Sequence, residues 1–209
     1  MSQETPSAGN TPLLERVQNI LLRPKLEWPV IEAEAATVRS VFVPYAVLLT
    51  AIAPLATLIG QQLMPVRVFG SVYRVNLFGG MISALVTWGL SLLAVYLLAL
   101  IIEALASSFD GVKDRLRAVK VAVYASTAAW VAGIFGLIPA LSWLGGLLGL
   151  YSLYLLYLGL GRLMRVPETK TIGYTVVVVL AAIVLWVIVG AIVGSIIGAG
   201  VLSAAVFSY

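Results

Sequence analysis

The sequence predicts an all-α, polytopic membrane protein with five transmembrane helices and an amphipathic N-terminal helix at the membrane surface. Of its 209 residues, 61% are hydrophobic and 11% are charged, whereas soluble domains contain roughly 25% charged residues. Five apolar segments are each near or above the roughly 20 residues that cross the hydrocarbon core. The basic residues fall in short clusters between these segments, which is typical of membrane topology.

The first 37 residues divide into two segments. Residues 1–10 are polar and contain Pro, Gly and Ser, which predicts a disordered leader. Residues 11–37 predict a cytoplasmic amphipathic segment whose helix has Thr11 as N-cap and Pro12 at its first position. Its apolar and polar residues occupy opposite faces, with Leu13, Val17, Ile20 and Leu21 on one and Glu15, Arg16, Gln18 and Asn19 on the other.

This N-terminal helix is too short to cross a bilayer, because Pro24 ends it. A single apolar stripe suits the membrane surface, where Trp28 is the expected interfacial anchor. The alternative is that the stripe packs against the protein's own transmembrane bundle.

The transmembrane domain is predicted to occupy residues 38–209. Pro44 and Pro54 in its first span predict kinks, static or hinge-like, whose freed carbonyls find partners in neighbouring helices. Only Ile138, Pro139 and Ala140 separate the third and fourth spans, which predicts a tight helical hairpin. The five predicted spans are about 38–64, 78–107, 117–138, 140–162 and 172–202.

The Lys and Arg residues predict the orientation independently of hydropathy. With five spans, eleven of the 13 Lys and Arg residues fall on one side, and only Arg67 and Arg74 fall on the other. Because cytoplasmic loops carry the excess of positive charge, the N-terminus is predicted to be cytoplasmic and the C-terminus to lie across the bilayer. The eleven are Arg16, Arg23, Lys25, Arg39, Lys113, Arg115, Arg117, Lys120, Arg162, Arg165 and Lys170.

Histidine and cysteine are both absent, which excludes the usual transition-metal ligands, thiol nucleophiles and disulfides. No Gly-rich nucleotide-binding loop occurs. The net charge of +4 is explained by topology and does not indicate nucleic acid. We therefore expect no catalytic residues, no metal and no cofactor.

Glu103 is the only acidic residue within a predicted span, near the end of the second one. A carboxylate inside a bilayer is costly and is a candidate functional residue. The alternative is a structural ion pair with Lys113, Arg115 or Lys120.

Tyr151, Tyr154 and Tyr157 recur at three-residue spacing in the fourth span, so their hydroxyls form one stripe. These hydroxyls could line a polar path or form hydrogen bonds between helices, and the second interpretation is favoured. Tyr124, together with Ser126 and Thr127 in the third span, could supply the partners.

Gly190, Gly194 and Gly198 form a ridge of small residues at four-residue spacing, which predicts helix packing in the last span. The neighbour is either internal or a second copy of the chain, and the internal helix is favoured. Gly145 and Gly149 offer a weaker version of the same pattern in the fourth span.

Several stretches resemble the bacterial branch of the Yip1-domain family. They are RVQNILLRPKLEWPVIEAE, YLLALIIEALASSFDG, AVKVAVYASTAAWVAGIFGLIP, LLGLYSLYLLYLGL and GYTVVVVLAAIV, which together span residues 16–184. The resemblance implies five membrane helices and a cytoplasmic N-terminus. Gly173 and Tyr174 match the Gly-Tyr start of the family's last helix, where the glycine would allow close approach and the tyrosine would anchor the interface.

Eukaryotic members of this family act in vesicle trafficking with small GTPases, a role that does not transfer to bacteria. The resemblance implies instead a non-enzymatic protein of the bacterial inner membrane that binds partner proteins or lipids, or organises membrane. Its expected partners are anionic lipids at the cytoplasmic face, a protein partner or further copies of itself. The alternative is a small channel or transporter with a polar path near Glu103 and the tyrosine stripe.

Overall fold

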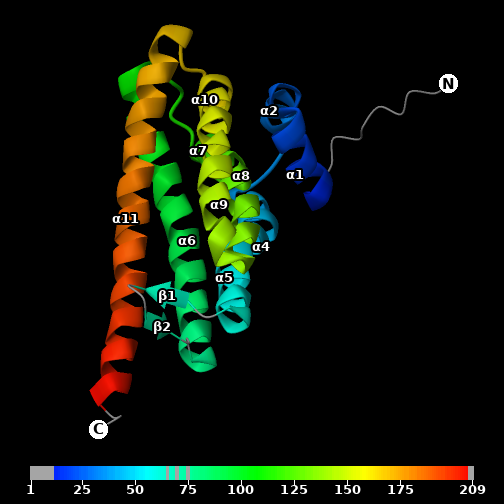
Figure 1. The fold of residues 1–209 in the computed structure, drawn as a ribbon. Helices are drawn as coiled ribbons and strands as arrows, with labels where there is room; N and C mark the ends of the chain where they lie inside the picture. The colour runs from blue at the N-terminus through cyan, green and yellow to red at the C-terminus, as the bar shows by residue number, and fades with distance from the viewer. Residues whose placement is uncertain (1–11, 65, 69–70, 74–75, 207–209) are drawn as a thin grey trace, which may run out of the picture.

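Five long apolar helices dominate the fold, which a computed structural model describes for residues 12–64, 66–68, 71–73 and 76–206 (Figure 1). The predicted leader, residues 1–10, lies outside the described residues. Five helical spans in the described chain are long and apolar enough to cross a membrane, which confirms the predicted all-α multi-pass class. They are Val38–Leu63, Leu77–Phe109, Arg115–Leu137, Ser142–Leu163 and Glu168–Ser195.

Four of the five spans are built from several shorter helical segments. The first comprises α3 (Val38–Val41), the π-helix η1 (Phe42–Ala46), α4 (Val47–Thr50) and α5 (Ile52–Leu63). The second comprises α6 (Leu77–Leu105) and the 3₁₀ turn η2 (Ala106–Phe109). The third comprises α7 (Arg115–Ala125), α8 (Thr127–Ala132) and η3 (Gly133–Leu137). After η4 (Pro139–Leu141), the fourth comprises α9 (Ser142–Gly149) and α10 (Tyr151–Leu163), and α11 (Glu168–Val206) is continuous.

Both prolines of the first span coincide with irregular backbone. Pro44 lies inside the π-helix η1, and a break at Ala51 precedes Pro54. At this break the Ala51 N–H donates to the Leu48 carbonyl, so the Val47 carbonyl loses its usual intrahelical partner. The Trp88 indole N–H of α6 donates to that carbonyl at 3.0 Å instead. The prolines themselves free the carbonyls of Ser40 and Thr50, four residues before each ring, so the Val47–Trp88 bond belongs to the break at Ala51 and partners for the two freed carbonyls stay a prediction.

The closest helix packing joins the first and third spans. A Cβ atom built at Gly133 would lie 2.5 Å from the Cβ of Ala53, and one at Gly60 would lie 2.5 Å from the Gly136 carbonyl oxygen. Only glycine allows such an approach at these positions. These three glycines lie outside the glycine patterns that predicted helix packing, because none belongs to a run of glycines at four-residue spacing in its span.

A short β-hairpin, which the sequence did not predict, joins the first two spans. Strands β1 (Val66–Val68) and β2 (Ser71–Tyr73) pair antiparallel, with Arg67 opposite Val72. Three-residue strands contain too little periodicity to be recognised from sequence. In Figure 1 the hairpin lies near the end of the bundle remote from α2.

The N-terminal segment forms two helices, α1 (Leu13–Leu22) and α2 (Pro24–Ala33), which we call the α1–α2 unit. Pro24 therefore begins a second helix, and does not simply end the first. The unit packs beside the bundle, with α2 against α10 and α1 against α8 (Figure 1).

Candidate functional site

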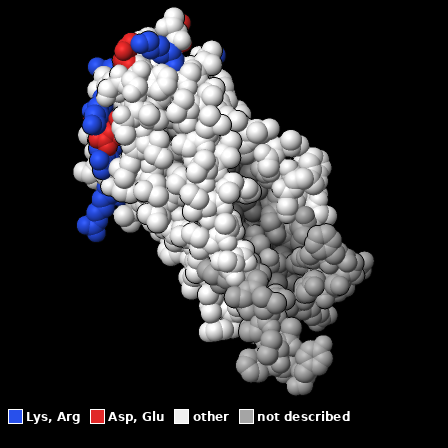
Figure 2. Space-filling model, turned by 90° about the vertical axis from the view of Figure 1, so that its left-hand side faces the viewer, with Lys and Arg blue, Asp and Glu red and all other residues white. Residues whose placement is uncertain are grey.

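Charged side chains gather at the end of the bundle where α10 passes into α11, which we call the charged end. On the face that Figure 2 shows, the Lys, Arg, Asp and Glu side chains of the described residues lie at this end, and the white, described surface below them carries no charged side chain. It carries Glu103, Arg115, Arg162 and Lys170, together with the α1–α2 unit beside it. Lys170 and Asp110 pair there at 2.5 Å.

Trp28 is not an interfacial anchor, which corrects the sequence prediction. Its side chain is 1% exposed and lies against α10 at Gly159, where the absence of a side chain leaves room for the indole. Ile20 and Ile31 of the same unit are also fully buried. The face predicted to lie on the membrane therefore packs against the protein's own bundle, the alternative that the sequence had left open.

Arg16 also differs from its prediction, because it was expected on the solvent side of the N-terminal helix. It is 3% exposed and forms ion pairs with Glu27, at 2.5 Å, and with Glu34. Its guanidinium carbon lies 5.7 Å from the centre of the Tyr124 ring, a cation–π distance. Burial of a charge requires such partners, so this cluster holds the two helices and the bundle together.

Glu32 of α2 lies at the convergence of three arginines. One carboxylate oxygen is 2.7 Å from Arg162 Nε, and the other is 3.5 Å from an Arg117 nitrogen and 3.6 Å from an Arg165 nitrogen. Arg117 comes from the third span, whereas the other two come from the end of the fourth and the residues after it. The acidic α2 is thus docked on basic ends of two spans.

Lys120 caps the C-terminal end of α2. Its ammonium donates to the carbonyl oxygens of Ile31 and Glu34, both at 2.7 Å. Carbonyls at the C-terminal end of a helix have no intrahelical partner, and a cation there also interacts favourably with the negative end of the helix dipole. A buried lysine of α7 therefore fixes the end of α2 in place.

The tyrosine residues of the third and fourth spans form separate contacts. Tyr124 stacks edge-on against Tyr45, whose hydroxyl is 2.8 Å from Thr127 Oγ1. The Tyr151 hydroxyl donates to the Leu21 carbonyl of α1 at 3.0 Å.

Two residues of the predicted stripe lie apart from this network. Tyr154 is exposed, with its ring 5.6 Å from that of Tyr151, and Tyr157 is half-buried. Among the described residues, no hydrogen bond joins the stripe to Tyr124. The hydrogen bond from Tyr151 to Leu21 joins the stripe to the α1–α2 unit instead.

Glu103 forms an ion pair with Arg115, one of the three partners considered from the sequence. Its carboxylate side chain is 15% exposed and that of the arginine is 48% exposed. Arg115 also donates to the Tyr96 hydroxyl at 3.4 Å. These contacts are sufficient for a structural ion pair between α6 and the start of α7.

Tyr174 is buried and is not an interface anchor, which corrects another expectation. Its ring stacks on Phe109 with centres 4.8 Å apart, and its hydroxyl donates to the Ile102 carbonyl of α6. At Gly173 an added Cβ would lie 3.6 Å from the Phe109 ring, an ordinary contact. Glycine is therefore not needed there for space.

The glycine ridge of α11 has no internal neighbour at the two positions whose surroundings are described. A Cβ at Gly190 or at Gly194 would have no atom of a described residue within 4 Å. The surroundings of Gly198 lie outside the described side chains. The favoured prediction, packing against an internal helix, is thus wrong for Gly190 and Gly194 within the described part of the chain. Packing against a second copy stays a prediction. Of the weaker pair, Gly145 lies close to the Ala132 carbonyl, whereas Gly149 is open.

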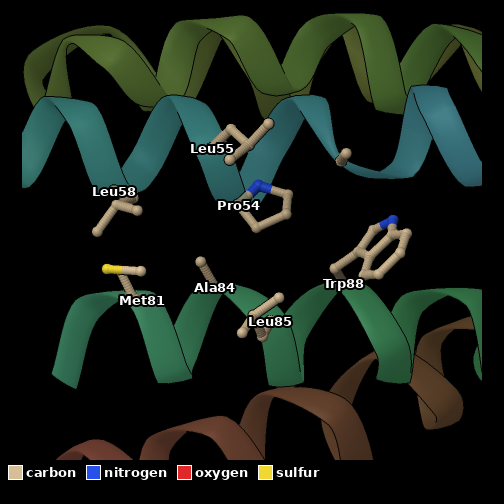
Figure 3. Close-up of a pocket in the computed structure, with 8 residues that line it drawn as sticks. Pro54, Leu55, Leu58, Met81, Ala84, Leu85 and Trp88 are labelled. Carbon is tan, nitrogen blue, oxygen red and sulfur yellow. The ribbon is translucent and has the colours of Figure 1, made fainter. Parts of the chain in front are cut away.

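Two grooves lie between α5 and the first half of α6, before the part of α6 that carries Glu103. One has a volume of about 300 Å³ and is apolar, with side chains of α5 facing those of α6 (Figure 3). The other, of about 250 Å³, adds Thr57, Gln61 and Ser83 and is also lined by Val193 of α11. Neither is lined by Glu103 or by a tyrosine of the stripe.

Among the described residues, no group of His, Cys, Asp and Glu side chains could hold a metal ion. The five spans and the docked N-terminal unit define a multi-pass helical membrane protein. A family model of the Yip1 domain matches residues 19–189. The chain belongs to the Yip1-domain family. No curated protein and no solved structure matches it.

Proposed function

We propose that this protein is non-enzymatic and binds partner proteins or lipids, or organises membrane, through its charged end. The proposed location is the bacterial inner membrane, with the N-terminus and the charged end in the cytoplasm and the C-terminus in the periplasm. The observation that carries the proposal is the α1–α2 unit, whose inner face is bound to the bundle and whose outer face is free to bind.

The outer face of the α1–α2 unit combines apolar and basic residues. Leu22, Leu26 and Val30 are exposed, and Arg23 and Lys25 lie among them in sequence and are exposed as well. Apolar side chains beside cations suit the boundary between lipid tails and anionic headgroups. The same face could receive an apolar helix of a partner protein.

The channel or transporter hypothesis has less support. Glu103 is paired with Arg115, and the Tyr151 hydroxyl is paired with α1. The two described grooves lie elsewhere, between α5 and α6. A polar path would need unpaired groups lining a continuous cavity. A binding role needs only the exposed outer face.

The orientation is tested by labelling single cysteines, since the chain has none of its own. In intact cells, Thr169→Cys should resist a membrane-impermeant thiol reagent, and Ser71→Cys should react. The reverse pattern would place the charged end in the periplasm and would overturn the proposal.

The binding role is tested by placing a photo-crosslinking amino acid at Leu26, which is 69% exposed. We expect adducts with one protein, or with anionic lipid above its share of the membrane. The same amino acid at Val184, an exposed position within α11, is the control and should capture bulk lipid only. Identical adducts at both positions, together with ion flux in proteoliposomes, would favour the channel.

A further inference from the structure

The arginines around Glu32 offer more positive charge than this carboxylate neutralises. Within the described residues, Glu32 is the only carboxylate within 4 Å of Arg162 or Arg165. Arg117, the third member, also pairs with Asp114 at 3.8 Å and donates to the Leu163 carbonyl at 2.9 Å. Arg162 and Arg165 therefore retain guanidinium N–H groups with no acidic partner in the described chain.

These two arginines are open to the surroundings. Their side chains are 55% and 61% exposed, whereas Glu32 is 17% exposed behind them. A guanidinium presents a planar fork of donors that matches two oxygens of a phosphate. Two neighbouring guanidinium groups can therefore bind one phosphate while Glu32 stays in contact with both of them.

The pair lies at the end of the fourth apolar span, where lipid headgroups are expected. Arg162 belongs to the last turn of α10, which ends the fourth span at Leu163, and Arg165 follows directly. Apolar residues of the span precede them, so the junction of hydrocarbon and water is expected at these arginines. A lipid can place its phosphate there while its chains lie along the span, which a soluble phosphate cannot do.

The backbone of Arg165 is a second, independent observation. Its φ angle is 53°, in the left-handed region where glycine is favoured after a helix. An ordinary side chain is disfavoured in this conformation. The chain thus carries an arginine where glycine would fit more easily, and strain of this kind is concentrated at functional sites.

We propose that Arg162 and Arg165, supported by Arg117, bind the phosphate of an anionic phospholipid at the charged end. The bound lipid would bridge the end of the fourth span and α2, because Glu32 contacts the same arginines. This site deepens the proposed function and rests on it, since it names the lipid class that the charged end takes.

The proposal is tested on the purified full-length protein in a neutral detergent. Thermal unfolding is followed while short-chain phosphatidylglycerol, phosphatidylcholine with the same chains, or inorganic phosphate is added. Phosphatidylglycerol should raise the melting temperature at low concentration. Phosphatidylcholine should bind about tenfold more weakly, because its choline cation is repelled by the arginine guanidinium groups. Inorganic phosphate should have no effect at the same concentration.

Arg165→Gly separates binding from folding. Without lipid this variant should be at least as stable as the wild type, because glycine adopts a positive φ freely. Its affinity for phosphatidylglycerol should fall about tenfold through the loss of a charge-assisted contact. Arg39→Ala is the matched control, since it removes an exposed cation from the start of the first span and should leave the affinity unchanged.

Three outcomes would overturn the site: equal affinity in Arg165→Gly and the wild type, equal loss in Arg39→Ala, or an equal shift with inorganic phosphate. The first two would mean unspecific attraction, and the third a site for a soluble anion. The measurement in detergent is independent of membrane orientation and of the face around Leu26. A failure here would thus leave the cross-linking result of the proposed function standing, and the converse also holds.

Discussion

The indole of Trp28 lies directly over Gly159, so that a Cβ atom added to this glycine would come within 2.6 Å of the ring carbon Cη2. The contact joins α2 to the middle of α10, and the indole is almost wholly buried. The docking of the α1–α2 unit therefore depends on the absence of one side chain.

Gly159→Ala should weaken this docking, because the buried indole has little room to move. Overpacking of this kind costs about 1–3 kcal/mol. We expect a lower melting temperature in detergent. Gly146→Ala, in the same span, is the control, since a Cβ there meets nothing within 4 Å. Equal stability of the two variants would mean that the indole is not held against α10.

Arg16→Ala should destabilise the protein strongly, because it removes this cation from the buried Glu27 and the partly buried Glu34. Breaking a buried ion pair from one side costs about 3–5 kcal/mol. The measurement is the melting temperature, with Glu15→Gln as control because Glu15 is exposed on the same helix. A variant as stable as the control would show that the cluster does not hold the unit.

The two sets of glycines predict opposite responses to the same substitution. Gly133→Val should lower the melting temperature, because its side chain would collide with Ala53. Gly194→Val should leave the folded monomer as stable as the wild type, since its surroundings are open. If Gly194→Val instead dissociates an oligomer in size-exclusion chromatography, the ridge packs against a second copy.

Glu103→Gln should lower stability without creating or abolishing ion flux in proteoliposomes. The substitution removes the charge that Arg115 pairs with, and the pair joins α6 to the start of α7. Arg115→Gln should have a similar effect on the melting temperature if the pair is structural. Flux that the wild type supports and Glu103→Gln loses at unchanged stability would restore the functional interpretation of this carboxylate.

Much of the fold is predictable from sequence because its signals are local. Each span shows its own run of apolar residues, and the proline between the third and fourth spans marks the hairpin. The predicted spans overlap all five helices, although the described helices begin or end several residues away at some ends. Family membership follows from the same ordered segments.

The candidate site was less predictable, because an apolar stripe does not reveal what covers it. Bilayer and protein interior are both apolar, so the stripe with Ile20 and Trp28 was equally compatible with either. The same ambiguity affected the ridge at Gly194, which proved open. One signal was available: Glu27, Glu32 and Glu34 cluster in one short stretch on the otherwise basic side. Complementary charge could have indicated docking of α2 on the basic loops.

Hydrogen exchange followed by mass spectrometry tests the central claim most directly, namely that the α1–α2 unit is docked on the charged end. With the wild-type protein in lipid nanodiscs, backbone amides of α1 and α2 should exchange as slowly as those at the ends of the spans, because docking suppresses local opening. In Arg16→Ala, exchange should accelerate in α1 and α2 while the spans stay protected, which separates docking from simple contact with lipid. Fast exchange of α1 and α2 in the wild type, or no change in the variant, would contradict the account.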